Sequence, residues 1–434
     1  MELLQVVRAV FFWLFDTLKG SKIKKEYSDI KKILENSGSL EYETKKNKYL
    51  KAILSHATTS TSYYQKYAEF KSIDDFPVIN KNLIKHNFES FRSSKYLKKS
   101  CVKVSTSGST GAPFMIMQDK HKRCRNTSDN LYFSNKAGYK IGQRLIYIKI
   151  WPENYKPNIL SPLWWKNIIP QSVFQLSDSD IKRFLDELKN DSNHKSFIGY
   201  SSAYEKICRY LDATKSEKID AKVDSIITIS ETLNEYTRNA LKKYFGVSPL
   251  SRYSNNENGI IAQEDFVRKK SFLINSASYY VEIFDLNKDV LIQNGKLGRI
   301  VITDLYNYAM PLIRYDTGDV GIMEVDENNA PYLSRIGGRK LDLIYNTKGE
   351  IIPSHVSYKL FKYGDFRQFQ LVQHGQKEYM IKLNTDKKVN EEKMLEEFMS
   401  YFGKDAIITI KYVNEIPLLS SGKRREVSNT YHTV

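Results

Sequence analysis

The chain has 434 residues, which is too long for one simple core and suits one large domain with one smaller domain. Hydrophobic residues make up 41% and charged residues 27%, proportions that are ordinary for a soluble globular protein. A formal net charge of +17 raises nucleic acid or an anionic membrane surface as partners, but the lysines and arginines are spread without a dense basic block. We therefore expect a solvated basic surface that attracts small anions, and no nucleic-acid partner.

The N-terminal apolar stretch at residues 3–18 is interrupted by Arg8 and Asp16, and it is shorter than the ~20 residues of a membrane span. No basic segment precedes it and no small-residue cleavage site follows, so we expect no signal peptide. Two alternatives remain for residues 1–20. They form an amphipathic helix packed on the domain surface, or this helix lies on the inner membrane face. The second alternative would bring the lysines among residues 1–25 to anionic lipid, namely Lys19, Lys22, Lys24 and Lys25.

The three cysteines are few, odd in number and widely spaced, at Cys101, Cys124 and Cys208. This pattern is typical of reduced thiols in a cytosolic protein, and it predicts neither a disulfide framework nor a thiolate zinc site. We therefore expect a cytoplasmic protein, with peripheral membrane contact as the alternative raised by its N-terminus.

From Arg144 onward, strand-like and helix-like segments alternate, which indicates an α/β domain. The predicted strands are 144–151, 225–229, 279–284 and 298–304. The predicted helices are 179–190, a helix after Ser201 and a helix that stops at Gly246. Capping-box patterns are predicted to open the last two helices, at Ser202 with Glu205 and at Thr232 with Glu235.

After Arg339 the pattern changes to a small β–α–β unit, with segments at 378–383, 391–402 and 406–413. We place the domain boundary at Gly338–Asp342. The predicted domains are residues 1–338 and residues 339–434.

The stretch Ser105–Pro113 reads STSGSTGAP and lies between two β-rich segments. Backbone N–H groups freed by glycine can surround phosphate oxygens, and the hydroxyls add donors. No Lys follows Gly111, so this is not the GxxxxGK[ST] nucleotide loop. The alternative is a flexible polar hairpin loop.

Two further stretches carry single carboxylates among polar residues. In Arg252–Gly259 (RYSNNENG), Glu257 suits a Mg²⁺ ligand beside a base-stacking Tyr253, and the alternative is an Asn-rich loop. In Ile313–Gly321 (IRYDTGDVG), Asp319 suits a bidentate bond to ribose hydroxyls, and the alternative is a β-turn.

The last two stretches lie near and within the C-terminal domain. Gly337–Ile344 (GGRKLDLI) has two glycines before Arg339, which permit a hinge. Pro417–Arg425 (PLLSSGKRR) places a lysine on a glycine-containing loop from which it could reach a distant site. The alternative for this stretch is an exposed basic tail.

In their order and spacing, these stretches resemble the signatures of the acyl-adenylate-forming superfamily of acyl-CoA synthetases, luciferases and peptide-synthetase adenylation domains. GYSSA at Gly199–Ala203 and SETL at Ser230–Leu233 add to the resemblance, which covers residues 45–430. It is nearest to the phenylacetate–CoA ligase-like branch, which includes the CapK proteins of capsular polysaccharide biosynthesis. It implies an α/β fold with a large multi-subdomain N-terminal adenylate-forming domain and a small mobile C-terminal α+β domain.

By this resemblance, the chain uses ATP and Mg²⁺ to activate a small carboxylic acid as an acyl-adenylate. The phosphates would be held by Thr106, Ser107, Gly108, Ser109, Thr110 and Gly111. The adenine and ribose would lie against Ser230, Glu231, Thr232, Tyr253, Ser254 and Asp319. The remaining roles would fall to Glu257 at Mg²⁺, Arg339 beside the ribose and Lys423 between the carboxylate and the α-phosphate. The acid would border Tyr200, Ser201 and Trp151, for which a structural role is the alternative.

Two departures from the family pattern affect these expectations. Leu341 stands two places after Arg339, where relatives often have a charged residue, so the pivot of a rotating small domain is shifted or differently biased. The stretch Gln263–Asn275 has neither Cys nor His, so we predict no structural zinc.

The acceptor of the acyl group is left open by the sequence. CoA or a carrier-protein thiol would give a thioester, whereas an amine or hydroxyl of a sugar would fit surface polysaccharide synthesis. A third alternative, a non-catalytic basic binding protein, is disfavoured because Lys423, Glu257 and Asp319 are all present.

Overall fold

The computed structural model describes residues 2–106, 114–152, 155, 161–268, 270–339, 342–352, 354–364, 366, 368–385, 389–417 and 424–431. The chain forms two compact units. Unit 1 comprises Met1–Thr317 and Gly321–Ile336, and unit 2 comprises Gly318–Val320 and Gly337–Val434. The predicted α/β class, with a large N-terminal and a small C-terminal domain, is confirmed. The boundary at residue 339 and the mobility of the small domain stay predictions.

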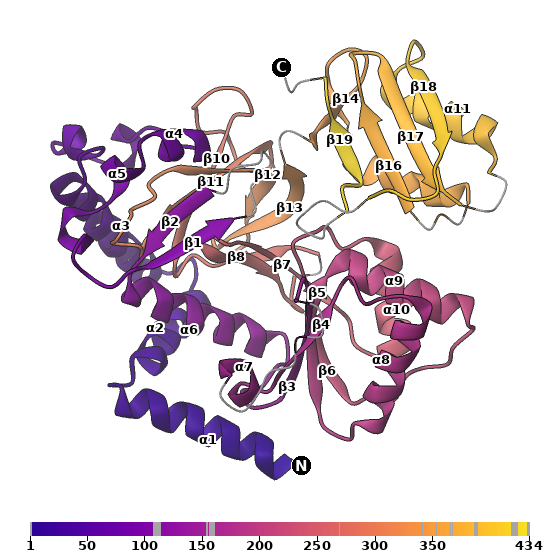
Figure 1. The fold of residues 1–434 in the computed structure, drawn as a ribbon. Coiled ribbons are helices and arrows are strands. Elements are labelled where there is room, and N and C mark those ends of the chain that lie inside the picture. Colours follow the sequence, from indigo (N-terminus) through magenta and orange to yellow (C-terminus); the bar gives the residue numbers. More distant parts are fainter. Residues whose placement is uncertain are drawn as a thin grey trace. The chain divides into compact units, whose positions relative to one another are not determined.

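The helices of unit 1 fall into an N-terminal group and a group interleaved with strands (Figure 1). The N-terminal group is α1 Glu2–Leu18, α2 Lys22–Glu35, α3 Leu40–Ser60, η1 Gln65–Tyr67, η2 Ile73–Asp75, α4 Lys81–His86, α5 Phe88–Phe91 and η3 Ser94–Tyr96. The second group is α6 Lys120–Lys136, α7 Pro162–Trp165, α8 Asp178–Asn190, α9 Ser201–Ala213 and α10 Glu235–Phe245. Among the described helices, none combines the length and the apolar character needed to cross a bilayer.

The strands of unit 1 form a two-stranded hairpin and a large sheet. The hairpin is β1 Val102–Thr106 with β2 Phe114–Gln118, paired antiparallel. The large sheet has the order β10-β11-β12-β13-β9-β8-β7-β6-β5-β3-β4. Its strands are β3 Arg144–Lys149, β4 Ile168–Ser172, β5 Lys195–Tyr200, β6 Val223–Ile229, β7 Leu250–Asn255, β8 Gly259–Glu264, β9 Phe272–Ile274, β10 Tyr279–Phe284, β11 Leu297–Asp304, β12 Tyr315–Val325 and β13 Pro331–Arg339.

The part of the sheet that runs β4-β3-β5-β6-β7 is parallel throughout. Helices α8, α9 and α10 cover one face of it with a buried cluster that includes Ile181, Ile207 and Leu241. The other face is closed by a second cluster that includes Ile198, Ile227 and the end of α6. Because both faces are covered, residues 225–229 of β6 are all buried and mostly apolar, without the alternation of a half-exposed strand. All carboxyl ends of these strands therefore meet at one edge of the sheet.

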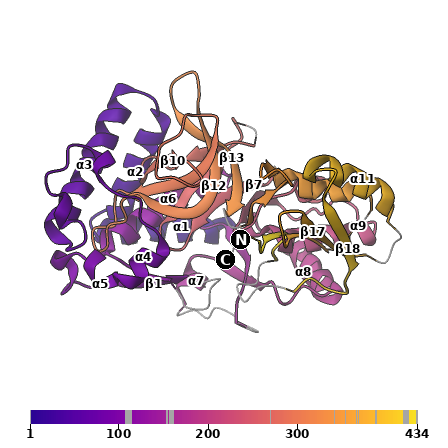
Figure 2. The same ribbon diagram turned by 90° about the horizontal axis from the view of Figure 1, so that it is seen from above.

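Helices α2, α3 and α6 pack together on another part of unit 1. Their buried residues, which include Ile33, Tyr42 and Phe133, join with Ile260 of β8 and Leu273 of β9 in one cluster. Figure 2 shows these helices on the same side of the unit as β10 and β12. Helix α6 is thereby held against the strands that surround the candidate site.

The local predictions agree with the structure except at two helix starts. The predicted strands and helices in residues 144–304 are present, and α10 ends at Gly246 as expected. The capping box at Ser202 with Glu205 is wrong, because the N-cap of α9 is Tyr200, two residues earlier, and Glu205 instead accepts from Arg209 and Asn234.

The second predicted capping box is also wrong. Helix α10 is capped by Asn234, whose Oδ1 accepts from the Thr237 N–H at 2.8 Å, and not by Thr232. Asn caps a helix at least as well as Thr does, and Asn234 stands directly before the first helical residue, so it is the N-cap.

Unit 2 is built on a four-stranded sheet of order β18-β17-β16-β19. Strands β17 and β18 are parallel and joined by α11, which is the predicted β–α–β unit. Its elements are β14 Ile344–Tyr345, β15 Ile351–Ile352, η5 Ser354–Lys362, β16 Gln368–Gln373, β17 Glu378–Asn384, α11 Glu391–Phe402, β18 Ile407–Tyr412 and β19 Val427–Asn429. Ile381, Phe398 and Phe402 are fully buried in its core.

We expect Ile381→Ala in β17 to lower the free energy of unfolding by about 2–5 kcal/mol, because it leaves a cavity in the core of unit 2. The matched control is Ile407→Ala in the neighbouring strand, where the side chain is 61% exposed. This control should cost less than about 1 kcal/mol. Urea unfolding followed by circular dichroism measures both, and equal losses for the two variants would contradict the packing described for unit 2.

Candidate functional site

Residues from three predicted motifs, together with Trp151, lie at the carboxyl edge of the parallel strands. In the strand register, Tyr200 of β5 pairs with Ile229 of β6, and Ile229 pairs with Arg252 of β7. Ser201 and Ser230, which follow β5 and β6, and Tyr253, which lies within β7, therefore stand at the same level of the sheet. Trp151 follows β3, whose Ile148 pairs with Gly199 of β5. This edge of a parallel sheet is where ligands commonly bind.

The predicted acid-binding turn and the predicted adenine motif are bonded to each other. The Glu231 carboxylate accepts from the Ser202 backbone N–H at 2.8 Å, and the Ser201 hydroxyl donates to the Glu231 carbonyl at 3.2 Å. Ser230, which connects β6 to this motif, has a left-handed φ of 71°. A non-glycine residue in that region is strained, and such strain is concentrated at functional sites. Thr232 is exposed beside them.

Tyr200 and Trp151 differ in what their polar atoms do. Burial raises the pKa of Tyr200 to about 12, so its hydroxyl stays protonated at neutral pH and can donate a hydrogen bond. The Trp151 indole N–H donates to the Tyr147 carbonyl at 2.8 Å, and its ring stacks on Tyr155 at a centroid distance of 5.7 Å. Both the acid-binding role and the structural role of Trp151 stay predictions.

The Glu257 carboxylate is almost fully buried and has two partners. Its Oε1 accepts from the Tyr315 hydroxyl at 2.7 Å and lies 3.0 Å from the Lys81 ammonium. Lys81 is held there because Ile79, two residues earlier, forms a parallel bridge with Tyr315. Neither Lys81 nor Tyr315 was assigned a role from the sequence. No local pattern marks Lys81, whereas Tyr315 stands inside the IRYDTGD stretch.

The strand after the predicted phosphate loop contacts the Glu257 region at both of its ends. At the start of β2, the Phe114 ring stacks on Tyr315 with an interplanar angle of 6°. At the end of β2, the Gln118 amide donates to the Glu257 carbonyl at 2.8 Å. The loop residues 107–113 themselves lie outside the described residues, as does the side chain of Thr106 at the end of β1. The backbone that leaves the loop is therefore fixed beside Glu257.

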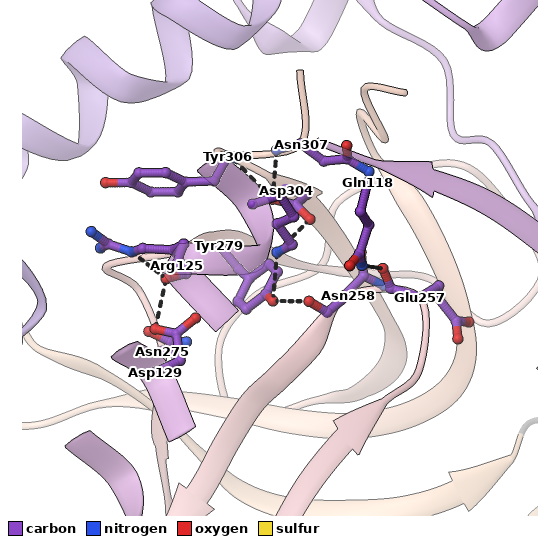
Figure 3. A network of polar contacts seen from close by, with 12 residues as sticks. Gln118, Arg125, Asp129, Glu257, Asn258, Asn275, Tyr279, Asp304, Tyr306 and Asn307 are labelled. Atoms are coloured by element: carbon purple, nitrogen blue, oxygen red, sulfur yellow. Dashed lines mark hydrogen bonds and ion pairs between the residues drawn. The ribbon is translucent and has the colours of Figure 1, made fainter. Parts of the chain in front are cut away.

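A buried polar network holds the turn that carries Glu257 (Figure 3). The Lys122 ammonium from α6 lies 2.7 Å from Asp304 of β11, and both side chains are fully buried. The same ammonium donates to the Tyr279 hydroxyl at 3.0 Å, which in turn donates to the Asn258 carbonyl at 2.5 Å. Burial raises the pKa of Tyr279, so this hydroxyl remains available as a donor.

Gly259, the last residue of the SNNENG motif, is required by this packing. Its φ is +117°, and a Cβ there would lie 2.9 Å from the Asn126 side-chain oxygen and 3.2 Å from the Tyr279 hydroxyl. Both the backbone angle and the close approach favour glycine. The buried ion pair therefore supports one side of the turn, and on the other side Asn126 and Tyr279 can approach closely because Gly259 has no side chain.

A second set of charges anchors α6 to the N-terminal helices. The Arg125 guanidinium bonds to Glu26 at 2.7 Å and to Asp29 at 2.8 Å, and it lies 4.0 Å from the centre of the Tyr306 ring. Burial raises the pKa of the nearby Asp129 carboxyl, an effect that Arg125 opposes. These contacts were not visible as motifs, because their partners are far apart in the chain.

The ribose motif is linked to the adenine motif through strands. The Tyr253 hydroxyl donates to the Thr317 hydroxyl at 3.2 Å, and Asp319 follows two residues later in β12. Ser254 and Asp319 are both partly buried. Arg314, within the same IRYDTGD stretch, is buried against Glu282 and serves the core.

The predicted residues of unit 2 are described only in part. Arg339 is exposed at the end of β13, after Gly338 with a positive φ of 82° that suits a hinge. Asp342 is paired with Arg425 of the PLLSSGKRR stretch at 3.8 Å, and burial raises the pKa of its carboxyl. Lys423 and Leu341 lie outside the described residues. All the predicted site residues keep their roles as predictions.

Among the described residues, no group of three or more His, Cys, Asp or Glu side chains could hold a metal ion. Mg²⁺ is commonly bound by one or two carboxylates, with substrate phosphates and water completing its shell. The single buried carboxylate of Glu257 fits that donor set, although Lys81 already neutralises one of its oxygens. The absence of zinc stays a prediction.

The fold is similar to that of adenylate-forming CoA ligases, and the predicted resemblance to the acyl-adenylate-forming superfamily is confirmed. A structure of 2-hydroxyisobutyryl-CoA ligase in the postadenylation state with 2-HIB-AMP aligns with a TM-score of 0.69 and 15% identity, over 91% of this chain and 90% of that one. ATP-bound MatB from Rhodopseudomonas palustris aligns with a TM-score of 0.54 and 15% identity, over 74% of this chain and 66% of that one.

A particular relative is recognised at the level of sequence. The chain is 22% identical to Protein CapK of Staphylococcus aureus, over 97% of each protein. Residues 343–430 match the CapK C-terminal domain family. The similarity to CapK thus extends over unit 1 and unit 2 alike.

We expect Lys122→Met to lower the free energy of unfolding by about 3–5 kcal/mol, because it leaves the buried Asp304 carboxylate unpaired. Adding Asp304→Asn should recover much of the loss, since it removes the uncompensated charge. Urea unfolding measures the series. Lys120→Met, at an exposed position of the same helix, is the matched control. If Lys122→Met were as stable as this control, the buried ion pair could not be what holds the turn.

Proposed function

We propose that this protein activates a small carboxylic acid with ATP and then transfers the acyl group to an acceptor. The observation that carries the proposal is the convergence of three separate motifs on Glu257. The SNNENG turn supplies this carboxylate, Tyr315 of the IRYDTGD stretch bonds to it, and β2 leads from the STSGSTGAP loop to its carbonyl. Such convergence is expected if all three motifs serve one nucleotide.

In the first half-reaction, a carboxylate oxygen of the acid attacks the α-phosphorus of ATP while the bond to pyrophosphate breaks. Acyl-AMP and pyrophosphate are the products. Both reactants carry negative charge, so catalysis depends on positioning and on neutralising that charge. Mg²⁺, held by Glu257 and the phosphates, would supply part of this neutralisation.

The chain's own residues would divide the remaining work. Residues 106–111 would donate N–H and O–H groups to the phosphates, and Lys423 would bridge the acid and the α-phosphate with a mobile ammonium. Lys81 adds a second cation at Glu257, on a side chain that is still 42% exposed. Tyr253, Asp319 and the Ser230–Thr232 segment would hold the nucleoside.

In the second half-reaction, a nucleophile attacks the acyl carbon and AMP leaves. CoA or a carrier thiol is the acceptor we favour, because the fold is shared with CoA ligases over most of the chain. The amine or hydroxyl of a sugar is the second candidate, because the likeness to CapK includes the C-terminal domain. Measuring AMP release with CoA and, separately, with nucleotide sugars would distinguish the two acceptors. AMP release that does not depend on CoA would count against thioester formation.

The first half-reaction is tested by pyrophosphate–ATP exchange over a panel of carboxylic acids. We expect exchange with at least one acid, and Lys423→Ala should reduce it by about two orders of magnitude or more, since a key charge contact is lost. Lys411→Ala, at an exposed position of unit 2, is the control and should exchange normally. Absence of exchange with every acid would argue against adenylation, and normal exchange in Lys423→Ala would remove this residue from the mechanism.

A second prediction concerns the Glu257 carboxylate. Glu257→Gln should lower the exchange rate by about a hundredfold, and Tyr315→Phe by about tenfold, because the first removes the charge and the second only a donor to it. The matched control is Tyr332→Phe, whose hydroxyl donates to Glu324 at 2.8 Å in the β12–β13 hairpin. Steady-state exchange rates at saturating ATP measure all three. Equal effects of the two Tyr→Phe variants would show that Tyr315 does not orient the carboxylate.

A further inference from the structure

Helix α1 turns its apolar side away from the rest of unit 1. Large hydrophobic side chains of this helix are 36% to 77% exposed, namely Leu3, Leu4, Val6, Val7, Val10, Phe11, Leu14, Phe15 and Leu18. At about 100° per residue, they fall within roughly one half of the helix circumference. So dense an exposed apolar face on one element marks an interaction surface.

The opposite side of α1 fixes the helix to unit 1 through polar groups and through the Trp13 ring, whose centre lies 6.4 Å from that of the Tyr27 ring. The Gln5 amide donates to the His194 carbonyl at 3.2 Å, and the Arg8 guanidinium lies 5.2 Å from the centre of the Trp164 ring. Asp16 is buried and accepts two backbone N–H groups from the first turn of α2 at 2.9 Å. An amphipathic helix of a globular domain usually buries its apolar face, whereas most of the large apolar side chains of α1 are exposed.

Lysines cluster where α1 ends and α2 begins. These lysines are all exposed, namely Lys19, Lys22, Lys24 and Lys25. Within the described part of the chain, no ion pair uses a lysine of this cluster, and Glu26 beside it is paired with Arg125 and His121. The Lys19 ammonium lies 4.5 Å from the centre of the Phe15 ring on the apolar face. The cluster therefore presents uncompensated positive charge next to the apolar face, on a chain whose net charge is already +17. An anionic lipid surface is complementary to both features at once.

We propose that α1 and the lysines that follow it form a membrane-binding surface, which rests in the plane of an anionic bilayer. The apolar face would enter the boundary between headgroups and acyl chains, and the lysines would lie against the headgroups. The helix has 17 residues, so it lies along the surface and does not cross it. Contact with a second copy of the chain would bury the apolar face but would leave the lysines without a role. This inference goes beyond the proposed function and requires no catalysis.

The test is flotation of the full chain with vesicles of phosphatidylcholine mixed with phosphatidylglycerol, and with vesicles of phosphatidylcholine alone. The wild type should float with the mixed vesicles. Replacing Phe11 and Phe15 by Ser should reduce the floating fraction by about tenfold, because two rings are lost from the membrane-facing side. The matched control replaces Phe174 and Phe266 by Ser, which are 61% and 56% exposed elsewhere on unit 1, and it should float like the wild type.

A second set of variants tests the charge. Replacing Lys22, Lys24 and Lys25 by Gln should weaken flotation with the mixed vesicles by several fold, and added salt should weaken wild-type flotation in the same way. The control replaces three exposed lysines of α8 and α9 by Gln, namely Lys182, Lys189 and Lys206. All these positions are exposed, so thermal unfolding should be unchanged in every variant.

Three results would overturn the proposal. The first is that the wild type floats with neither kind of vesicle. The second is that the Phe11 and Phe15 variant floats as well as the wild type does. The third is that the wild type proves to be a dimer and this variant a monomer. The last result would identify a second copy as the occupant of the face. Pyrophosphate exchange is measured without vesicles and flotation without ATP, so the failure of one does not bear on the other.

Discussion

The buried ion pair between Lys122 and Asp304 is the contact on which the geometry of the candidate site depends. Two charges fully inside a protein cost more than they return unless their other bonding capacity is also used. Here Asp304 also accepts the backbone N–H groups of Tyr306 and Asn307, and Lys122 bonds to Tyr279. Because Tyr279 then holds the carbonyl of Asn258, the residue next to Glu257, helix α6 and strands β10 and β11 fix the turn as one rigid body.

Local patterns predicted the secondary structure well where one interaction dominates. Residues 225–229 of strand β6 are buried on both faces and mostly apolar, and α11 has a regular apolar face and a glycine at its end. The helix starts were harder, because several capping residues compete within a few positions. At α10, Asn234 and Thr232 both precede the helix, and the choice depends on the phase in which the helix packs on the sheet. The sequence alone does not define the start of such a helix to within one residue.

The parts of the site that the sequence did not reveal come from contacts between distant segments. Lys81 reaches Glu257 only because residue 79 pairs with β12, and no spacing rule links a short N-terminal helix to that strand. The sheet order, in which β13 lies beside β9, is equally invisible to a local pattern. Helix α1 shows the same limit. Its apolar half was evident from the residues, but which half faces the protein was set by Gln5, Arg8 and Asp16 finding partners on other elements.

Under the proposed function, the surroundings of Glu257 would let one carboxylate serve with and without a nucleotide. A buried charge must be neutralised at all times, and Lys81 and Tyr315 meet that need in the protein alone, both at Oε1. A divalent cation brought in with the nucleotide would compete with Lys81 for this carboxylate. The Lys81 side chain is 42% exposed, so under the proposed function its ammonium would be free to turn from the carboxylate toward a phosphate oxygen. Tyr315 is fully buried and cannot follow, and it would keep the carboxylate in place throughout.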